Sequence, residues 1–203
     1  QFWGEHVRDV GRASTEVIDR AVAYMKSSSR VDAYIQAAWA ANTRHRDKWD
    51  VRRSIHPLHI CGWFDLGHLI PALGYGTADI DVEETTHQQT PLMYACRRGN
   101  VETVQRFLEL GADVNKQSRK GRTPLFEAIQ RLQKDCKSHE LNDDSKFLKK
   151  VFNSKEDIKK SEQIVKLLLA SKHGNNFNPN IRNPKLLQRT ALITSIAFMQ
   201  VTI

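Results

Sequence analysis

The sequence is poor in cysteine and has no long apolar run. Three cysteines, Cys61, Cys96 and Cys136, occur at wide spacing in 203 residues, an odd number that argues against a disulfide framework. No run approaches the roughly 18 consecutive apolar residues that a membrane helix needs, so we expect no membrane span. The first residues do not combine a basic region with an apolar stretch, so we expect no secretory signal. These absences favour the reducing cytoplasm, with the nucleus as the alternative compartment.

Sequence motifs for catalysis are missing too. No glycine is followed by lysine anywhere in the chain, which excludes the phosphate-binding loop G-x-x-x-x-G-K-[ST]. No Ser/His/Asp or Cys/His arrangement stands out either. The acidic pairs Glu83–Glu84 and Asp143–Asp144 lie in loop-like contexts, where we expect solvated side chains. We therefore expect no enzymatic activity, no catalytic residue and no cofactor.

Positive charge is concentrated toward the C-terminal end. Lys and Arg outnumber Asp and Glu by 31 to 23, a net charge of +8, and residues 133–203 hold 13 of these basic residues against 7 acidic ones. A basic excess favours nucleic acid or acidic proteins as partners. No DNA- or RNA-binding motif accompanies the lysines, and a solvated lysine-rich surface would give the same composition. We therefore expect a protein or acidic peptide before nucleic acid.

A repeated motif organises most of the chain. Its prolines, Pro57, Pro91 and Pro124, lie 34 and then 33 residues apart. Each proline is followed by Leu, and by Cys or Ala three residues after that Leu. A period near 33 with the core Thr-Pro-Leu-His-x-Ala resembles the ankyrin-repeat family. The resemblance implies an all-α fold, a solenoid of helix–turn–helix repeats joined by turn or hairpin loops and capped N-terminally by a short helical segment.

Each part of this motif has a physical role. The Thr hydroxyl before the proline caps the first helix, and the proline starts that helix because a first-turn N–H has no helical partner to lose. Gly99–Asn100 is expected to end the first helix of the second repeat. Residues 101–110 predict its second helix, with the apolar side chains on one face. That face comprises Val101, Val104, Phe107 and Leu108.

The motif also predicts where the repeats begin and end. About 27 extra residues separate Pro124 from the apolar run 167–169, compared with the second repeat. This insertion is either an extended helix with a mobile tip or a docking element. Thr190 starts a partial fourth repeat, so we expect a fragment or truncated product with a frayed C-terminus. The expected units are 1–53 as a helical linker and cap, and ankyrin repeats over 54–203, namely 55–88, 89–121, 122–187 with the insertion near 133–160, and 188–203.

The first 53 residues contain no ankyrin motif. Two amphipathic stripes, within 17–25 and 31–39, predict helices that cover the open end of the first repeat. The segment Phe2–Arg8 resembles the Trp-x-x-His-x-Arg motif of fungal NACHT–ankyrin proteins of the STAND class. That resemblance implies a helical linker leading into ankyrin repeats, and so a non-catalytic regulatory part of a larger ATPase-containing receptor.

Potential zinc ligands cluster in the first repeat, and they are His56, His59, Cys61 and His68. The alignment of the repeats explains them differently. His59 occupies the ankyrin His position, which in that family ties neighbouring loops together by hydrogen bonds, and Cys61 occupies the small position of Ala95. Cys96 also falls on a small core-facing position, so we expect a buried thiol and no nucleophile. We expect no metal site.

The repeats predict a binding face. Ankyrin stacks present turn tips and inner helices on a concave side, and in that family these variable positions make most contacts. Arg and aromatic residues dominate interface energies, and we expect this face to bind a protein or acidic peptide. As an alternative, Trp63 and Phe64 pack against the N-terminal helices. The predicted contact residues are Trp63, Phe64, Arg97, Arg98, Gln117, Arg119, Lys120, Arg122, Gln130 and Arg131.

Overall fold

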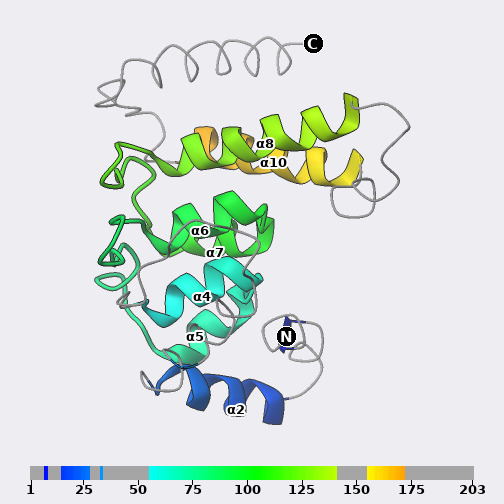
Figure 1. Ribbon diagram of the computed structural model, residues 1–203. Coiled ribbons are helices and arrows are strands. Elements are labelled where there is room, and N and C mark those ends of the chain that lie inside the picture. The colour runs from blue at the N-terminus through cyan, green and yellow to red at the C-terminus, as the bar shows by residue number, and fades with distance from the viewer. Residues whose placement is uncertain (1–6, 9–14, 28–32, 34–54, 141–154, 172–203) are drawn as a thin grey trace.

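The computed structural model describes residues 7–8, 15–27, 33, 55–140 and 155–171. These ranges contain seven α-helices with defined ends, one 3-10 helix and no strand. The helices lie in layers one above another, and the turns between successive layers lie along one side of the stack (Figure 1). The predicted all-α solenoid is therefore confirmed for the described part of the chain.

Three helix pairs form the repeats. Each first helix starts at one of the three spaced prolines, as the motif predicts. The second helix of the first repeat is the shortest, and it consists of a 3-10 turn followed by one α-helical turn. In chain order the elements are α4 (Pro57–Phe64), η1 (Gly67–Leu69), α5 (Ile70–Leu73), α6 (Pro91–Arg98), α7 (Val101–Glu109), α8 (Pro124–Glu140) and α10 (Lys155–Ala170).

Side chains cap the first helices, as predicted for the Thr residues. Thr90 Oγ1 and Thr123 Oγ1 each accept a hydrogen bond from the N–H three residues on, at 3.4 and 3.3 Å. In the first repeat His56 replaces Thr, and its Nδ1 accepts the N–H of Leu58 at 3.3 Å. Gly99 ends α6 with a φ of 78°, a conformation that glycine adopts without steric cost. Capping residues near each end thus determine where these helices begin and end.

The third repeat has longer helices than the second. α8 has 17 residues where α6 has 8, and α10 has 16 where α7 has 9. α8 therefore enters the range 133–160, and α10 begins inside it. Residues 141–154 lie outside the described residues, so the choice between an extended helix and a docking element at the tip of the insertion stays a prediction.

Helix α2 (Thr15–Met25) lies beside α5 at one end of the stack (Figure 1). Its side chains Ala21 and Met25 are buried, and Ile18 and Val22 pack against the core. This stripe is the first of the two that the sequence predicts. The second stripe, within 31–39, the Phe2–Arg8 motif except residues 7–8, and the partial fourth repeat with its frayed end lie outside the described residues.

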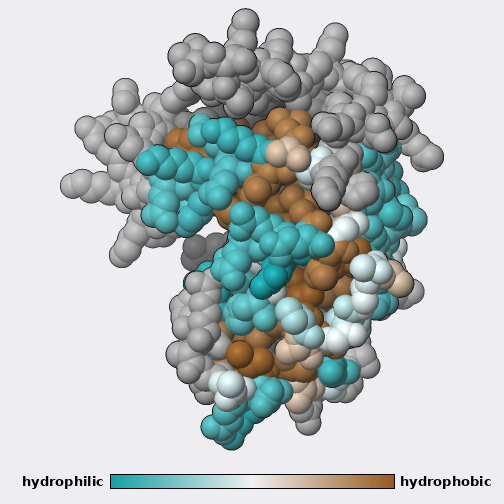
Figure 2. Space-filling view, turned by 180° about the vertical axis from the view of Figure 1, so that it is seen from behind, coloured by the Kyte–Doolittle hydropathy of each residue, from teal (hydrophilic) through white to brown (hydrophobic). Residues whose placement is uncertain are grey.

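One continuous apolar core runs through the layers. Seen from behind, apolar residues form a band up the stack with hydrophilic residues on both sides (Figure 2). Gly62 marks a close approach of two layers, because a Cβ at this position would lie 2.5 Å from the carbonyl oxygen of Pro91. Leu58, Leu92 and Phe107 are fully buried in this core. The layers therefore stabilise one another by burying apolar faces that no single repeat could cover.

Candidate protein-interaction face

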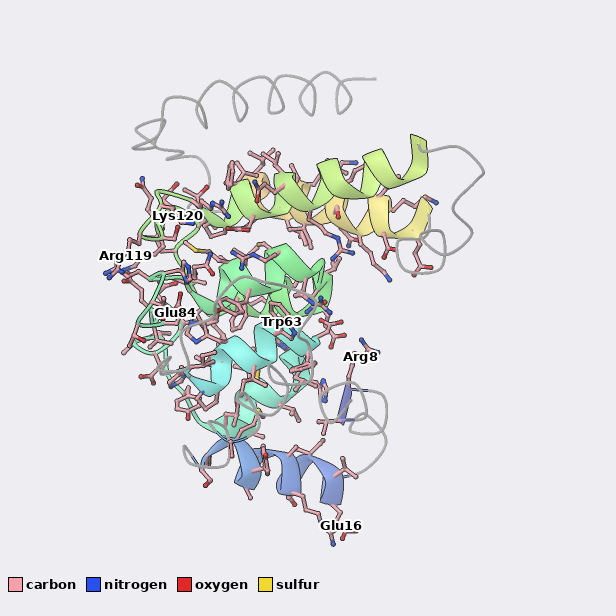
Figure 3. All side chains as sticks on the ribbon, in the orientation of Figure 1. Arg8, Glu16, Trp63, Glu84, Arg119 and Lys120 are labelled. Carbon is pink, nitrogen blue, oxygen red and sulfur yellow. The ribbon has the colours of Figure 1, made fainter. Side chains whose placement is uncertain are left out.

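The ten predicted contact residues lie on two parts of the stack. We call this set the inner face. Six of them come from the first helices α4, α6 and α8, and four come from the turn that leads into α8. Arg119 and Lys120 lie at the turn side, and Trp63 lies toward the other end of the helices (Figure 3). The inner face therefore has a turn end and a helix end.

Aromatic rings and guanidinium groups stack at the helix end. The Cζ atom of Arg98 lies 4.7 Å from the centre of the Trp63 ring. The ring of Trp63 in turn lies 5.9 Å from that of Tyr94. A contact between an arginine and an indole, like that of Arg98 with Trp63, is worth about 0.5–1 kcal/mol at exposed sites. Trp63 is thus partly covered by α6, and its position is determined by the second repeat.

A buried carboxylate occupies the middle of the inner face. The side chain of Glu127 in α8 is 1% exposed, and it accepts two hydrogen bonds of 2.9 Å from Arg97. Arg122 Nη1 lies 3.6 Å from the same carboxylate. Burial alone would lower the pKa of Arg97, but the hydrogen bonds and charge of Glu127 raise it. Arg97 and Arg122 therefore hold α6, α8 and the preceding turn together.

Sequence reasoning missed Glu127. Its signal is a charged residue inside the apolar run Leu125–Ile129, 33 residues after Tyr94 in the repeat register. A charge at such a position is buried only when it has a partner, and the partner Arg97 lies 30 residues away. Only the stacking of α6 on α8 brings the two together.

Arg131 links the second and third repeats at the helix end. Its Nη1 donates a hydrogen bond of 2.8 Å to the carbonyl oxygen of Arg98. That carbonyl is one of those left without a helical partner at the end of α6. Gln130, beside Arg131 in α8, is half-buried, as is Phe64, which packs against the core. The helix end of the inner face is therefore built from all three repeats.

The turn end carries two exposed basic side chains on a well-defined backbone. The N–H of Arg119 donates to the carbonyl oxygen of His87 in the neighbouring turn at 2.8 Å. The N–H of Ser118 donates to the carbonyl oxygen of Arg122 at 2.9 Å, and Gly121 adopts a φ of 71° between them. Arg119 and Lys120 are exposed, and Gln117 is half-buried.

The prediction of solvated side chains for the acidic pair Glu83–Glu84 holds for only one of the two residues. Glu83 is exposed, but the side chain of Glu84 is completely buried, so the expectation of a solvated carboxylate is wrong for it. Its oxygens accept the N–H groups of Thr86 and His87, both at 2.7 Å. Glu84 thus supplies acceptors for two N–H groups of a half-buried turn. Glu84 therefore shapes the turn next to Arg119.

The apparent zinc ligands have other roles. His59 Nε2 donates a hydrogen bond of 2.9 Å to the carbonyl oxygen of Gln89, which confirms the predicted link between neighbouring loops. Burial lowers the pKa of His59 to about 4, so the ring is neutral. Burial raises the pKa of the Cys61 thiol to about 12, and that of Cys96 rises for the same reason. Within the described ranges, no three His, Cys, Asp or Glu side chains gather as a metal site would require.

Comparison with known proteins identifies a repeat family in the middle of the chain. Residues 58–138 match the family model described as ankyrin repeats (3 copies). Palmitoyltransferase ZDHHC13 of Mus musculus is 43% identical over 51 residues, 25% of this chain and 8% of the relative. Rabankyrin-5 is 50% identical over 54 residues in Mus musculus and 53% over 47 in Homo sapiens, 27% and 23% of this chain and 5% and 4% of the relatives. The chain thus matches under a tenth of the length of these relatives.

The described helix pairs are therefore ankyrin repeats, and the solenoid is an ankyrin solenoid. Ankyrin repeats generally mediate protein–protein interaction and are typically non-catalytic. The similarity covers only repeats, so the activity in the name of one relative belongs to that relative. None of the helices in the described part is long and apolar enough to cross a membrane.

Proposed function

We propose that this ankyrin solenoid binds a protein partner through its inner face, and that the partner presents an acidic segment. The observation that carries the proposal is the combination of an exposed basic turn with a Trp63–Arg98 stack on the same face. Aromatic and arginine side chains provide much of the energy of protein interfaces. Exposed cations speed encounter with an acidic partner and fix its orientation.

The ten residues of the inner face have different roles in this proposal. Arg119 and Lys120 supply charge, and Trp63, Arg98 and the residues around them supply contact area. Arg97 and Arg122 act as supports, because Glu127 engages both guanidinium groups. A charge reversal at Arg97 would place two carboxylates together in a buried site, so it would test folding rather than binding.

Site-specific photocrosslinking tests the proposed face on the full chain. A benzoylphenylalanine at Lys120 or Gln130 should give a polypeptide adduct in extracts of the source cells. The same group at Gln105, an exposed position on α7, is the matched control and should not give that adduct. Identical adducts from all three positions, or none from the inner face, would show that the partner does not bind there.

Nucleic-acid binding through the basic residues 133–203 is the alternative. It predicts nuclease-sensitive adducts and retention of the chain on DNA or RNA that falls steeply with salt. A filter-binding titration tests this alternative, since the absence of retention even at low salt would exclude it. The lysines of α10 that support this alternative, Lys159, Lys160 and Lys166, are exposed.

A wider context rests on the Phe2–Arg8 resemblance. We propose that the repeats serve a larger receptor with a NACHT-type ATPase, acting in the cytoplasm. The coding sequence next to this segment decides the matter. A phosphate-loop ATPase encoded upstream supports the proposal, and an unrelated domain there removes it.

A further inference from the structure

Carboxylates neutralise the positive charge of the inner face in its middle but not along its whole length. In the middle, Arg97 and Arg122 face the buried Glu127. Glu84, also buried, acts electrostatically on Arg97 as well. Two cations and two carboxylates therefore balance here, and a partner carboxylate would have to compete with Glu127 for the same guanidinium groups. The middle of the face has little attraction for an anion.

The turn end differs from the middle. Among the residues that the structure describes, no carboxylate lies within ion-pair distance of Arg119 or Lys120. The nearby Lys116 is engaged by Glu83 at 3.5 Å. Hydrogen bonds to His87 and within the turn hold the backbone that presents the two exposed side chains. The turn end thus presents two exposed cations that differ from the paired arginines of the middle.

The helix end carries an exposed guanidinium group stacked on an indole. The Cζ atom of Arg98 lies 4.7 Å from the centre of the half-buried Trp63 ring. Planar side chains stack well on guanidinium and indole groups. α6, with 8 residues, separates the two ends, a length of about 12 Å at about 1.5 Å per residue. An extended peptide covers this length with about four residues.

We infer that the inner face recognises a peptide segment with a fixed polarity, acidic at the end that meets Arg119 and Lys120 and aromatic at the end that meets Trp63 and Arg98. This inference rests on the proposed function and specifies the partner's chemistry. A uniformly acidic segment fits less well, because its central carboxylates would lie over the balanced middle of the face and lose hydration without gaining a partner.

Two fluorescein-labelled peptides of the same composition test the polarity on the full chain. The block peptide has glutamates at one end, about four Ser and Gly residues, and tyrosines at the other end. The permuted peptide spaces its glutamates evenly. Fluorescence anisotropy should show the block peptide binding about fivefold or more tightly. Lys120→Glu or Arg119→Glu should weaken it about tenfold, and Trp63→Ala should weaken it less.

The matched control is Arg106→Glu, which makes the same charge change at an exposed site on α7 and should leave the affinity unchanged. Circular dichroism and Tm should confirm that each variant is folded. Equal binding of the two peptides overturns the polarity and leaves an acidic partner standing. If neither peptide binds, the acidic partner fails as well. Tighter binding of a single-stranded oligonucleotide than of the block peptide overturns the inference in favour of nucleic acid.

Discussion

Two successive junctions of the same solenoid are joined by different chemistry. Between the first and second repeats the buried polar links are hydrogen bonds such as that of the neutral His59 ring to the carbonyl oxygen of Gln89, whereas the ion pair of Lys116 with Glu83 is partly exposed. Between the second and third repeats the carboxylate of Glu127 engages Arg97 and Arg122. The helices stack alike in both, so the backbone arrangement does not dictate the polar chemistry. The junctions should therefore respond differently to mutation and to pH.

A second hydrogen-bonded cluster belongs to the first junction. Thr103 Oγ1 donates to Asp65 at 2.8 Å and accepts the N–H of Gly67 at 3.1 Å. Asn100 Nδ2 donates to the carbonyl oxygens of Gly62 and Trp63 at 2.7 and 3.2 Å. These bonds satisfy backbone groups where α4 ends. The helix α7 thus positions the end of the helix that presents Trp63.

Removing the carboxylate of Glu127 should have the largest effect. Glu127→Ala leaves the partly buried Arg97 without its partner, and breaking a buried ion pair in this way costs about 3–5 kcal/mol of unfolding free energy. Urea unfolding followed by circular dichroism measures the loss. Glu109→Ala is the control, since Glu109 is 62% exposed in its pair with Arg106, and it should change stability by about 0.5 kcal/mol or less. A loss below about 1 kcal/mol for Glu127→Ala would mean that the charged junction is not essential.

Acid should weaken the first junction through His59. Its pKa falls from 6.5 to about 4 because of burial, so the unfolded chain binds the proton more readily. The contribution of the neutral His59 ring to the free energy of unfolding is complete above pH 6.5, and it is lost as pH falls from 6.5 toward about 4. It amounts to about 3 kcal/mol at about 1.4 kcal/mol per pKa unit.

The His59 prediction has a neutral control. In His59→Gln the side-chain amide can still donate to the Gln89 carbonyl but does not titrate. Urea unfolding at pH 7 and pH 5 should show a smaller loss for this variant than for the parent chain. Parallel pH profiles of the two proteins would show that His59 does not cause the acid sensitivity.

The sequence predicts features that depend on near neighbours. The helix starts at Pro57, Pro91 and Pro124, the Thr caps and the end of α6 at Gly99 follow from residues a few positions apart. The buried thiols were also predictable, because the repeat register places Cys61 and Cys96 on small core positions.

Other features depend on contacts between layers or on the folding of a turn. The pair Arg97–Glu127 spans 30 residues and exists only once the helices stack. Glu84 is buried because two N–H groups of its own turn need an acceptor, which composition does not reveal. The pairing of Arg97 and Arg122 with Glu127 could therefore not be predicted from the sequence. Which residues of the inner face contact a partner stays a prediction.

The close approach of α4 and α6 gives the next prediction. Gly62→Ala places a methyl group 2.5 Å from the backbone oxygen of Pro91, so the layers must separate at a cost of about 1–3 kcal/mol. Gly76→Ala is the matched control, because a Cβ there meets nothing within 4 Å. Thermal unfolding should show a lower Tm only for the first variant. An unchanged Tm for Gly62→Ala would indicate that the first junction is looser than its geometry implies.

Thr103→Val should have the smallest effect of the four, since the side chain keeps its shape and loses only the hydroxyl. The N–H of Gly67 and the carboxylate of Asp65 then lack a partner, a loss of about 1–2 kcal/mol in urea unfolding. Thr103→Ser keeps the hydroxyl and should recover the hydrogen-bonding part of the loss, although it removes a buried methyl group. If Val and Ser variants are equally stable, packing rather than hydrogen bonding holds α7 against the end of α4. The first junction would then have no important polar link at Thr103. Its contrast with the second junction, which Arg97 and Glu127 join by charge, would be greater.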